Sequence, residues 1–533
     1  MPLSSTEARL PGRRALARCW DIFFERHFAS DFCSFFYKPD LEDPETQQPF
    51  LTAAVVCLCS RYLTPKEAKE DFGLSSGADV CNRFSPIVRN MAKASSDEPT
   101  VRNIQANLIL AMSEFLDNAG SRHWMYGGIA IRMAQIMRLH KDYHQAHSLK
   151  EQEIRRRTFW ACLLFDNLLA YFLSKPLSLT IISVALPGTD ASIAFREASR
   201  GLNLDNLIYF SGFPSEIGII PYFIKTVSLW SQIVDFNVFN RRFVEKEPPT
   251  DHTSFFHKRH QDLRDWISAL PPGLHWSWDN YRSHSSLGQG REFIAMNFLM
   301  HSSFCVAHQL YLPQLDGSTI LLDINDEAGW SLLQREPRLL FCCVTNALKV
   351  GEMMFTLLEA DAKSQSEMQS VWVASSILSV FNTLLWMQYA GDPEYGTVEM
   401  ASKAREYFSQ FLSVLSSWAV HWRAAQAWLD TLKKAEVMYR GAYLGEFDQG
   451  ILDSLGGTST VDEEDEEGNG RTFRPQPGDG YPTSTEVPNL YASLRYIITD
   501  TTTKPKVLQY VWNGFASGWT QGLAGIADEL GFK

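Results

Sequence analysis

The fold is decided by residues 121–187, SRHWMYGGIAIRMAQIMRLHKDYHQAHSLKEQEIRRRTFWACLLFDNLLAYFLSKPLSLTIISVALP. Two strong helical patterns lie in this segment. The first begins near Ser121, and its apolar residues recur every three or four positions, which predicts a buried face; they are Trp124, Ile129, Met133, Ile136 and Met137. The second runs from about Leu149 to Phe172, with Trp160 among its core positions. Gly127 and Gly128 each destabilise a helix by roughly 1 kcal/mol relative to alanine. Because glycine has no side chain, we expect the pair to let another helix approach closely.

A histidine-rich connection joins the two patterns. His140, His144 and His147 stand at i, i+4 and i+7, which would suit a metal ion if the helix continued. Ser148 and Glu151, however, match a capping box, which starts a new helix. We therefore expect a solvated connector rather than a metal site.

Three adjacent arginines, residues 155–157, precede the apolar stripe of the second helix. Because they span about 200° of helix, at most two can share a face. Our interpretation is surface charge paired with Glu151 or Glu153. The alternative is contact with an anion or a phosphate group.

Asp166 lies among leucines and phenylalanines, so we expect it to be partly buried. A buried carboxylate needs a partner. We predict an ion pair with Arg132, whose stem should be half-buried, or with Arg122 of the preceding helix.

The rest of the chain predicts an all-α fold, because strand-period alternation does not persist anywhere. Further helices are expected at residues 19–28, 50–62, 84–94, 101–116, 222–243, 255–270, 292–312, 337–359, 368–389, 398–415 and 418–439. We read residues 1–18 as a flexible tail and 19–447 as one large, irregular multi-helix domain. Residues 448–485 form an acidic, Gly/Pro-rich segment that is predicted to be disordered. The aromatic-rich residues 486–533 are expected to dock on the domain or, alternatively, to act as an activation segment.

The composition argues against several classes of function and location. A net charge of −12 argues against a duplex-binding surface over the whole chain. Nine scattered cysteines do not match a disulfide framework, which favours a reducing compartment. Residues 371–390 are long and uncharged enough to cross a membrane, but their serines, Asn382 and Gln388 favour a buried helix, so we expect no membrane partner.

Chemistry-bearing residues elsewhere fit core positions. Cys57 and Cys59 point about 200° apart on a helix, and adjacent Cys342 and Cys343 about 100° apart, so neither pair should chelate one ion. His301 and His308 are read as core or rim residues rather than ligands. Phosphate-loop, nucleophile-elbow, dinucleotide and zincin motifs are not found, and we expect neither an enzyme nor a cofactor in this chain.

Two signatures within residues 120–187 resemble the regulatory domain of the fungal-specific transcription factor family, whose members usually carry a zinc binuclear cluster. The first comprises Gly120, Arg122, Trp124, Gly128, residues 130–134 with Arg132 at their centre, and Leu139–His140; the second comprises Glu153, Arg155, Arg156, Arg157, Phe159, Trp160, Asp166, Lys175–Pro176 and Leu186–Pro187. The likeness is strongest over residues 19–190. This chain departs from the family at Ser174–Lys175 and at Asn167, where the family has Gly-Arg and Arg, so any role of those arginines is in doubt.

The resemblance implies a nuclear transcription regulator whose helical domain binds a small-molecule effector or a protein partner in an apolar cavity between helices. It also implies dimerisation, coactivator contacts and, for the cluster alone, zinc and DNA. The six-cysteine spacing of that cluster does not occur in this sequence, so zinc and DNA contact are assigned to none of its residues. A truncated gene model, a natural cluster-less regulator and the partner of a DNA-binding subunit all stay open.

Two other functions also stay open. One is a coregulator that acts only through protein association. The other is a helical lipid- or terpenoid-binding protein, or an enzyme on the same scaffold, without a role in transcription.

Overall fold

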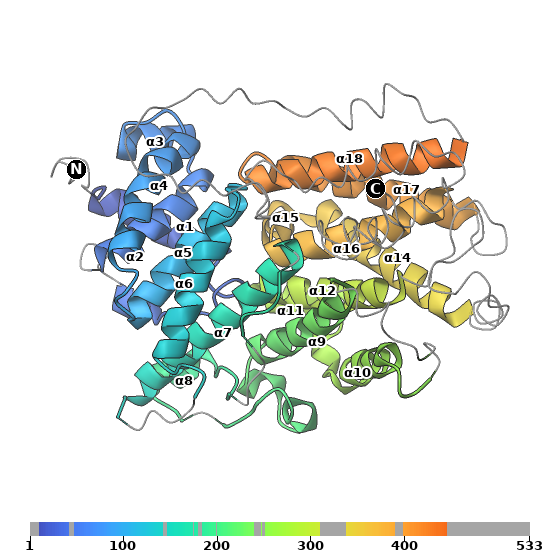
Figure 1. The fold of residues 1–533 in the computed structure, drawn as a ribbon, viewed down its shortest axis with the longest axis horizontal. Helices are drawn as coiled ribbons and strands as arrows, with labels where there is room; N and C mark the ends of the chain where they lie inside the picture. Colours follow the sequence, from blue (N-terminus) through green and yellow to red (C-terminus); the bar gives the residue numbers. More distant parts are fainter. Residues whose placement is uncertain are drawn as a thin grey trace, which may run out of the picture.

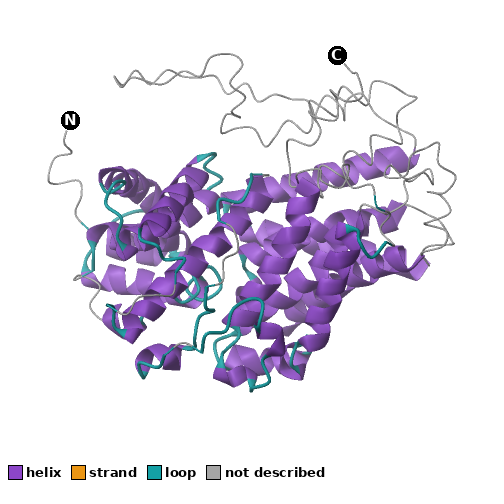
Figure 2. Cartoon of the chain, turned by 60° about the horizontal axis from the view of Figure 1, so that its bottom comes forward, coloured by secondary structure: helices purple, strands orange, loops and turns teal. Residues whose placement is uncertain are grey.

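The computed structural model describes residues 10–41, 47–141, 146–173, 175–179, 184–198, 200–238, 247, 251–309, 337–389 and 398–444. Within these ranges every regular element is a helix, which confirms the predicted all-α class (Figure 2). The α-helices are α1 Arg13–Arg26, α2 Pro49–Cys59, α3 Pro65–Phe72, α4 Gly77–Ala94, α5 Val101–Leu116, α6 Arg122–Ile136, α7 Leu149–Leu173, α8 Asp190–Ala194, α9 Ile220–Val238, α10 Phe255–Ala269, α11 Trp278–Ser286, α12 Gly290–His308, α14 Pro337–Ala360, α15 Ala362–Met368, α16 Val371–Tyr389, α17 Val398–Trp418 and α18 Arg423–Leu444.

The helices form two blocks that α7 joins. Figure 1 shows α1–α6 in one half and α9–α18 in the other, with α7 between the two halves. Helix α12 packs against α9, α14 and α16. One continuous hydrophobic core reaches from Leu16 of α1 to Tyr439 of α18. The described helices therefore share one core and do not form a solenoid of repeated units.

The last helices return to the first ones. In the turn before α18, His421 Nδ1 lies 3.0 Å from the carbonyl oxygen of Arg61. Trp422 Nε1 donates to the hydroxyl of Tyr62 over 2.7 Å. Arg61 and Tyr62 belong to the 3-10 turn Ser60–Tyr62 that follows α2, so residues 360 positions apart in the sequence are in direct contact.

Two described helices are long and apolar enough to cross a membrane. Of these, α16 is 94% buried inside the protein, as a core helix should be. The second segment, Phe341–Ala360 of α14, is 44% buried and packs against α12, α16 and α17. The structure thus places α16 at the centre of the domain, as the sequence predicted.

The N-terminal boundary was wrong. Helix α1 begins at Arg13, so residues 13–18 are not part of a flexible tail. Ala15 and Leu16 are each only 2% exposed, because they extend the apolar stripe of Cys19 and Trp20 by one turn. The predicted segments 448–485 and 486–533 lie outside the described residues.

The predicted buried face of α6 was wrong at Trp124 and Ile136, although Met133 is buried as predicted. Trp124 is 37% exposed and Ile136 67% exposed, whereas Tyr126, Ala130 and Ala134 are buried. Small residues explain this rotation, because they let α6 press closely against its neighbours, as at Gly127, where an added Cβ would lie 2.7 Å from Phe165 Cε1. The close approach expected for both glycines therefore holds for Gly127, while signature Gly128 faces open space.

Candidate functional site

The charged signature residues of α7 form a buried network instead of a surface. Glu153 is 5% exposed, Arg156 8% and Arg157 2%. Arg157 Nε donates to Glu153 over 3.0 Å, and Arg156 also pairs with Glu153. The sequence correctly anticipated pairing with Glu153, but the interpretation as surface charge was wrong.

Arg157 ties α7 to two distant loops. One terminal nitrogen donates to the carbonyl of Ser34 over 3.0 Å and to Asp190 Oδ1 over 2.7 Å. The other donates to the carbonyl of Gly188 over 2.9 Å, and the N–H of Gly188 in turn donates to Glu153. All three nitrogens of this guanidinium thus donate hydrogen bonds to protein oxygens. This favours a structural role over the anion contact that the sequence left open.

Asp166 is 5% exposed, which confirms its burial, but the predicted ion pair with Arg132 or Arg122 was wrong. Its Oδ2 accepts the backbone N–H groups of Ser178 and Leu179, each over 2.8 Å. Arg132 is exposed and bonds Gln135, and Arg122 pairs with Glu114. The chain folds back after α7 and presents its own N–H groups, so backbone dipoles replace the expected cation.

Burial raises the pKa of Asp166 to about 6, although the N–H donors of Leu179 and Ser178 oppose this shift. A folded-state pKa above that of the unfolded chain means that the folded protein binds the proton more tightly. Its contribution to stability is therefore fully present below about pH 4 and is lost as the pH rises through about 6.

We expect Asp166→Asn to become more stable relative to wild type by about 2 kcal/mol between about pH 4.5 and about pH 7.5. The amide carbonyl can still accept both N–H groups but carries no buried charge. Urea unfolding midpoints at the two pH values measure this difference. Asp166→Ala should be destabilised at both, because it leaves two donors without an acceptor; a pH-independent gap for Asp166→Asn would contradict the assignment.

The remaining signature residues divide between core and surface. Trp160 is fully buried and donates from Nε1 to the carbonyl of Ala185 over 2.8 Å, and Pro187 is also buried. Pro176 is exposed just after α7, and His140 is half-exposed.

The connector between α6 and α7 contains the other two histidines of the series. His147 Nδ1 lies 3.0 Å from Glu151, while His144 lies outside the described residues. Helix α6 ends at Ile136, well before His140. Ser148 Oγ accepts the N–H of Glu151 at the start of α7, as the capping pattern predicted.

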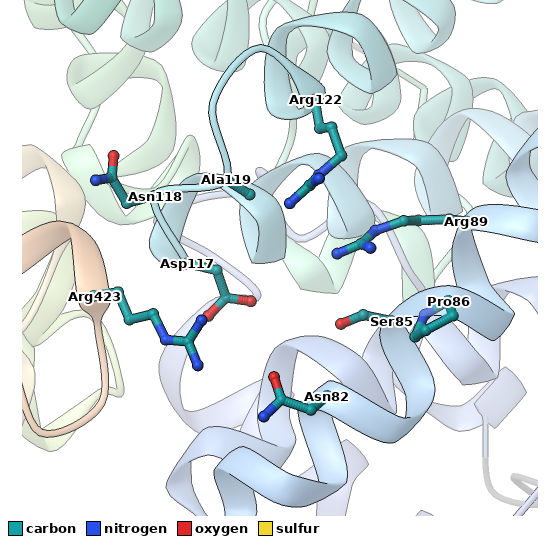
Figure 3. A pocket seen from close by; sticks show the side chains of 9 residues that line it. All are labelled: Asn82, Ser85, Pro86, Arg89, Asp117, Asn118, Ala119, Arg122 and Arg423. Atoms are coloured by element: carbon teal, nitrogen blue, oxygen red, sulfur yellow. The ribbon is translucent and has the colours of Figure 1, made fainter. Parts of the chain in front are cut away.

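A polar pocket opens where α4, the α5–α6 turn and α18 meet. Its volume is about 300 Å³. Figure 3 shows Arg89 and Arg122 reaching into it from one side, and Arg423, beside Asp117, from the other. The full lining is Asn82, Ser85, Pro86, Arg89, Asp117, Asn118, Ala119, Arg122 and Arg423. The polar lining differs from the apolar cavity that the family resemblance implied.

Two buried residues, Glu114 and Arg61, form ion pairs with the charged side chains that line the pocket. Glu114 is 2% exposed and accepts from Arg89 over 2.6 Å and from Arg122 over 2.7 Å. The buried Arg61 contacts Asp117 over 3.2 Å. Four guanidinium groups thus face two carboxylates, which leaves an excess of positive charge at the pocket.

Only Arg122 of this set was identified from the sequence, as a signature residue. Arg89 and Arg423 had no signal, because they come from helices hundreds of residues apart in the chain. Arg423 is exposed at the first position of α18, so its guanidinium is available to a ligand. A site assembled from three distant segments has no spacing pattern that a single sequence can reveal.

Comparison with known proteins finds the same family that the signatures resemble. The fungal-specific transcription factor domain matches residues 19–268, a range that includes both signatures and two of the pocket arginines. This match and the relatives below support the fungal-specific transcription factor family. The domain match stops short of α18, so Arg423 lies outside it.

The relatives are distant in sequence. An uncharacterized transcriptional regulatory protein of Schizosaccharomyces pombe is 22% identical over 83% of this chain and 66% of its own length. A Zn(2)-C6 fungal-type transcription factor of Fusarium oxysporum f. sp. lycopersici is 23% identical over 53% of this chain and 32% of its own length. A second S. pombe transcriptional regulatory protein is 24% identical over 56% of this chain and 33% of its own length. The chain thus spans between a third and two thirds of these relatives.

Proposed function

We propose that this chain regulates transcription in the nucleus and that its helical domain responds to a small anion bound in the polar pocket. The domain match over residues 19–268 supports the regulatory role, as do relatives named as transcriptional regulators. The proposed role is not enzymatic. DNA is reached indirectly, through a partner or a zinc cluster supplied elsewhere.

The observation that carries the effector proposal is the convergence of Arg89, Arg122 and Arg423 on one cavity. Planar guanidinium groups recognise carboxylates and phosphates with paired hydrogen bonds. The volume of about 300 Å³ lies at the lower end of ligand pockets, which fits a small metabolite. A bound anion would connect α6 to α18 and so join the two blocks of the domain.

We expect citrate or inorganic phosphate to bind the purified chain and Arg423→Ala to weaken that binding about tenfold or more, the value of a charge-assisted hydrogen bond. Arg423 is the preferred position, because its removal leaves Glu114 paired with Arg89 and Arg122. Isothermal titration calorimetry at low salt measures the affinity.

Arg132→Ala is the matched control, since Arg132 is an exposed arginine of α6 that does not line the pocket. Equal affinities of wild type and Arg423→Ala, or no binding of either anion, would overturn the effector site. The regulatory role is tested separately by fusing the chain to a heterologous DNA-binding module upstream of a reporter gene. An unchanged reporter would overturn that role.

The same fusion separates the alternatives. A cluster-less coregulator would change the reporter when tethered, yet the purified chain would not bind DNA by itself. Chromatin association that disappears when a DNA-binding partner is deleted would favour the coregulator. A metabolite change without any reporter effect would point to the helical lipid- or terpenoid-binding protein.

A further inference from the structure

Three potential metal ligands from three helices converge far from the polar pocket. They are His260 of α10, His308 of α12 and Cys342 of α14, and one ligand atom of each lies within 4.8 Å of the other two. Helix α12 packs against both α10 and α14, so the packing of the domain fixes this meeting point. Two imidazole nitrogens and a thiolate are a ligand set that Zn²⁺ prefers.

The orientation of His308 is the strongest feature. Its ring is 1% exposed, and Nδ1 lies 2.7 Å from the carbonyl oxygen of Phe304. A proton on Nδ1 donates to that carbonyl and leaves the lone pair on Nε2. In the part of the chain that the structure describes, this buried Nε2 has no hydrogen-bond partner. Metal-binding histidines are commonly fixed in this way by a backbone carbonyl behind the ring.

The other two ligands have suitable surroundings. The rings of His260 and His308 meet edge to face with centroids 5.0 Å apart. Nδ1 of His260 is also buried without a partner among the described residues. Asn346 Nδ2 lies 3.6 Å from Cys342 Sγ and can stabilise a thiolate there. His260 and Cys342 are half-buried, so an ion can enter from the surface.

We propose that His260, His308 and Cys342 bind one Zn²⁺ ion. Tetrahedral zinc with Zn–N near 2.0 Å and Zn–S near 2.3 Å holds its ligand atoms roughly 3.5 Å apart. The ligands must therefore move inward by about 1 Å, which rotation of the two half-buried side chains can supply. The thiol proton is released to solvent on binding, and water takes the fourth position.

This site differs from the six-cysteine cluster of the family, because it needs only one cysteine and lies within the helical domain. The sequence analysis assigned His308 to the core or rim. The three ligands of the proposed site are separated by 48 and 34 positions, so they show no chelating spacing. Their convergence follows only from the packing of α10, α12 and α14. The bound ion would connect these three helices near the end of α12.

We expect the full chain, purified without chelator or loaded with one equivalent of Zn²⁺, to retain about one zinc per chain after desalting, as measured by inductively coupled plasma mass spectrometry. Co²⁺ should substitute and give a thiolate-to-cobalt charge-transfer band together with the intense visible bands of tetrahedral cobalt. Cys342→Ser should abolish the charge-transfer band, and His308→Gln should weaken metal binding at least tenfold. Circular dichroism establishes that each variant is folded.

Two neighbouring residues provide matched controls. Cys343→Ala removes the thiol next to Cys342 in α14. His301→Gln removes a second histidine of α12, the helix of His308, and Nδ1 of this histidine already lies 2.8 Å from Asn346. Both should keep the metal and the cobalt spectrum. A wild-type chain that retains no zinc, or a charge-transfer band that survives Cys342→Ser, would overturn the site.

Discussion

Arg157→Met is expected to lower the free energy of unfolding by about 3–5 kcal/mol, the usual effect of removing one member of a buried charged network. Arg157 is 2% exposed and connects α7 with the carbonyls of Ser34 and Gly188. Methionine fills a similar volume but donates no hydrogen bond. The two carbonyls and one carboxylate oxygen of Glu153 therefore lose the hydrogen bonds that Arg157 donates. Urea unfolding followed by circular dichroism measures the change in midpoint.

The control is Arg132→Met, which changes another signature arginine. Arg132 is exposed and bonds only Gln135 among the hydrogen bonds described, so we expect a change below about 0.5 kcal/mol. Equal destabilisation of the two variants would contradict the buried network. A stable Arg157→Met variant would show that apolar packing compensates for the lost charge, as it does in some proteins.

Trp160→Ala is expected to cost about 3–5 kcal/mol, and Trp124→Ala less than about 1 kcal/mol. Both tryptophans belong to the family signature, but Trp160 is fully buried and donates to the carbonyl of Ala185, whereas Trp124 is 37% exposed. Removing the Trp160 ring leaves a large cavity and an unpaired carbonyl. Thermal unfolding of both variants compares the same substitution at two signature positions.

A Trp124→Ala variant that unfolds as early as Trp160→Ala would place Trp124 in the core, as its spacing had predicted. Trp160→Phe separates packing from the hydrogen bond, since it keeps an aromatic ring but cannot donate to Ala185. We expect it to retain more than half of the stability that Trp160→Ala loses.

The sequence predicted helix positions well and side-chain environments less well. The helices predicted near residues 101–116 and 149–172 appear as α5 and α7 within one residue, because apolar periodicity and capping act locally. Helices α3, α11 and α15 were missed, since each is short and carries few buried residues. The face of α6 was wrong at Trp124 and Ile136 because small residues, which carry little hydrophobic signal, decide how closely a helix can be approached.

Partners of buried charges were the least predictable. Asp166 was recognised as buried, but its acceptor role toward Ser178 and Leu179 depends on how the chain turns after α7. Arg423 and Cys342 gave no signal for the same reason, since each meets its neighbours only through tertiary packing. Of the residues that line the pocket, the family signatures identified only Arg122.

The contacts of His421 and Trp422 with the turn after α2 also bear on how the protein is synthesised. While the ribosome is still making the middle of the chain, the first helices lack the partners that cover Arg61 and Tyr62. The domain can therefore complete its fold only after the α17–α18 turn has left the exit tunnel. A nascent chain that stops before this turn exposes an aromatic surface, which is a form that chaperones and proteases recognise.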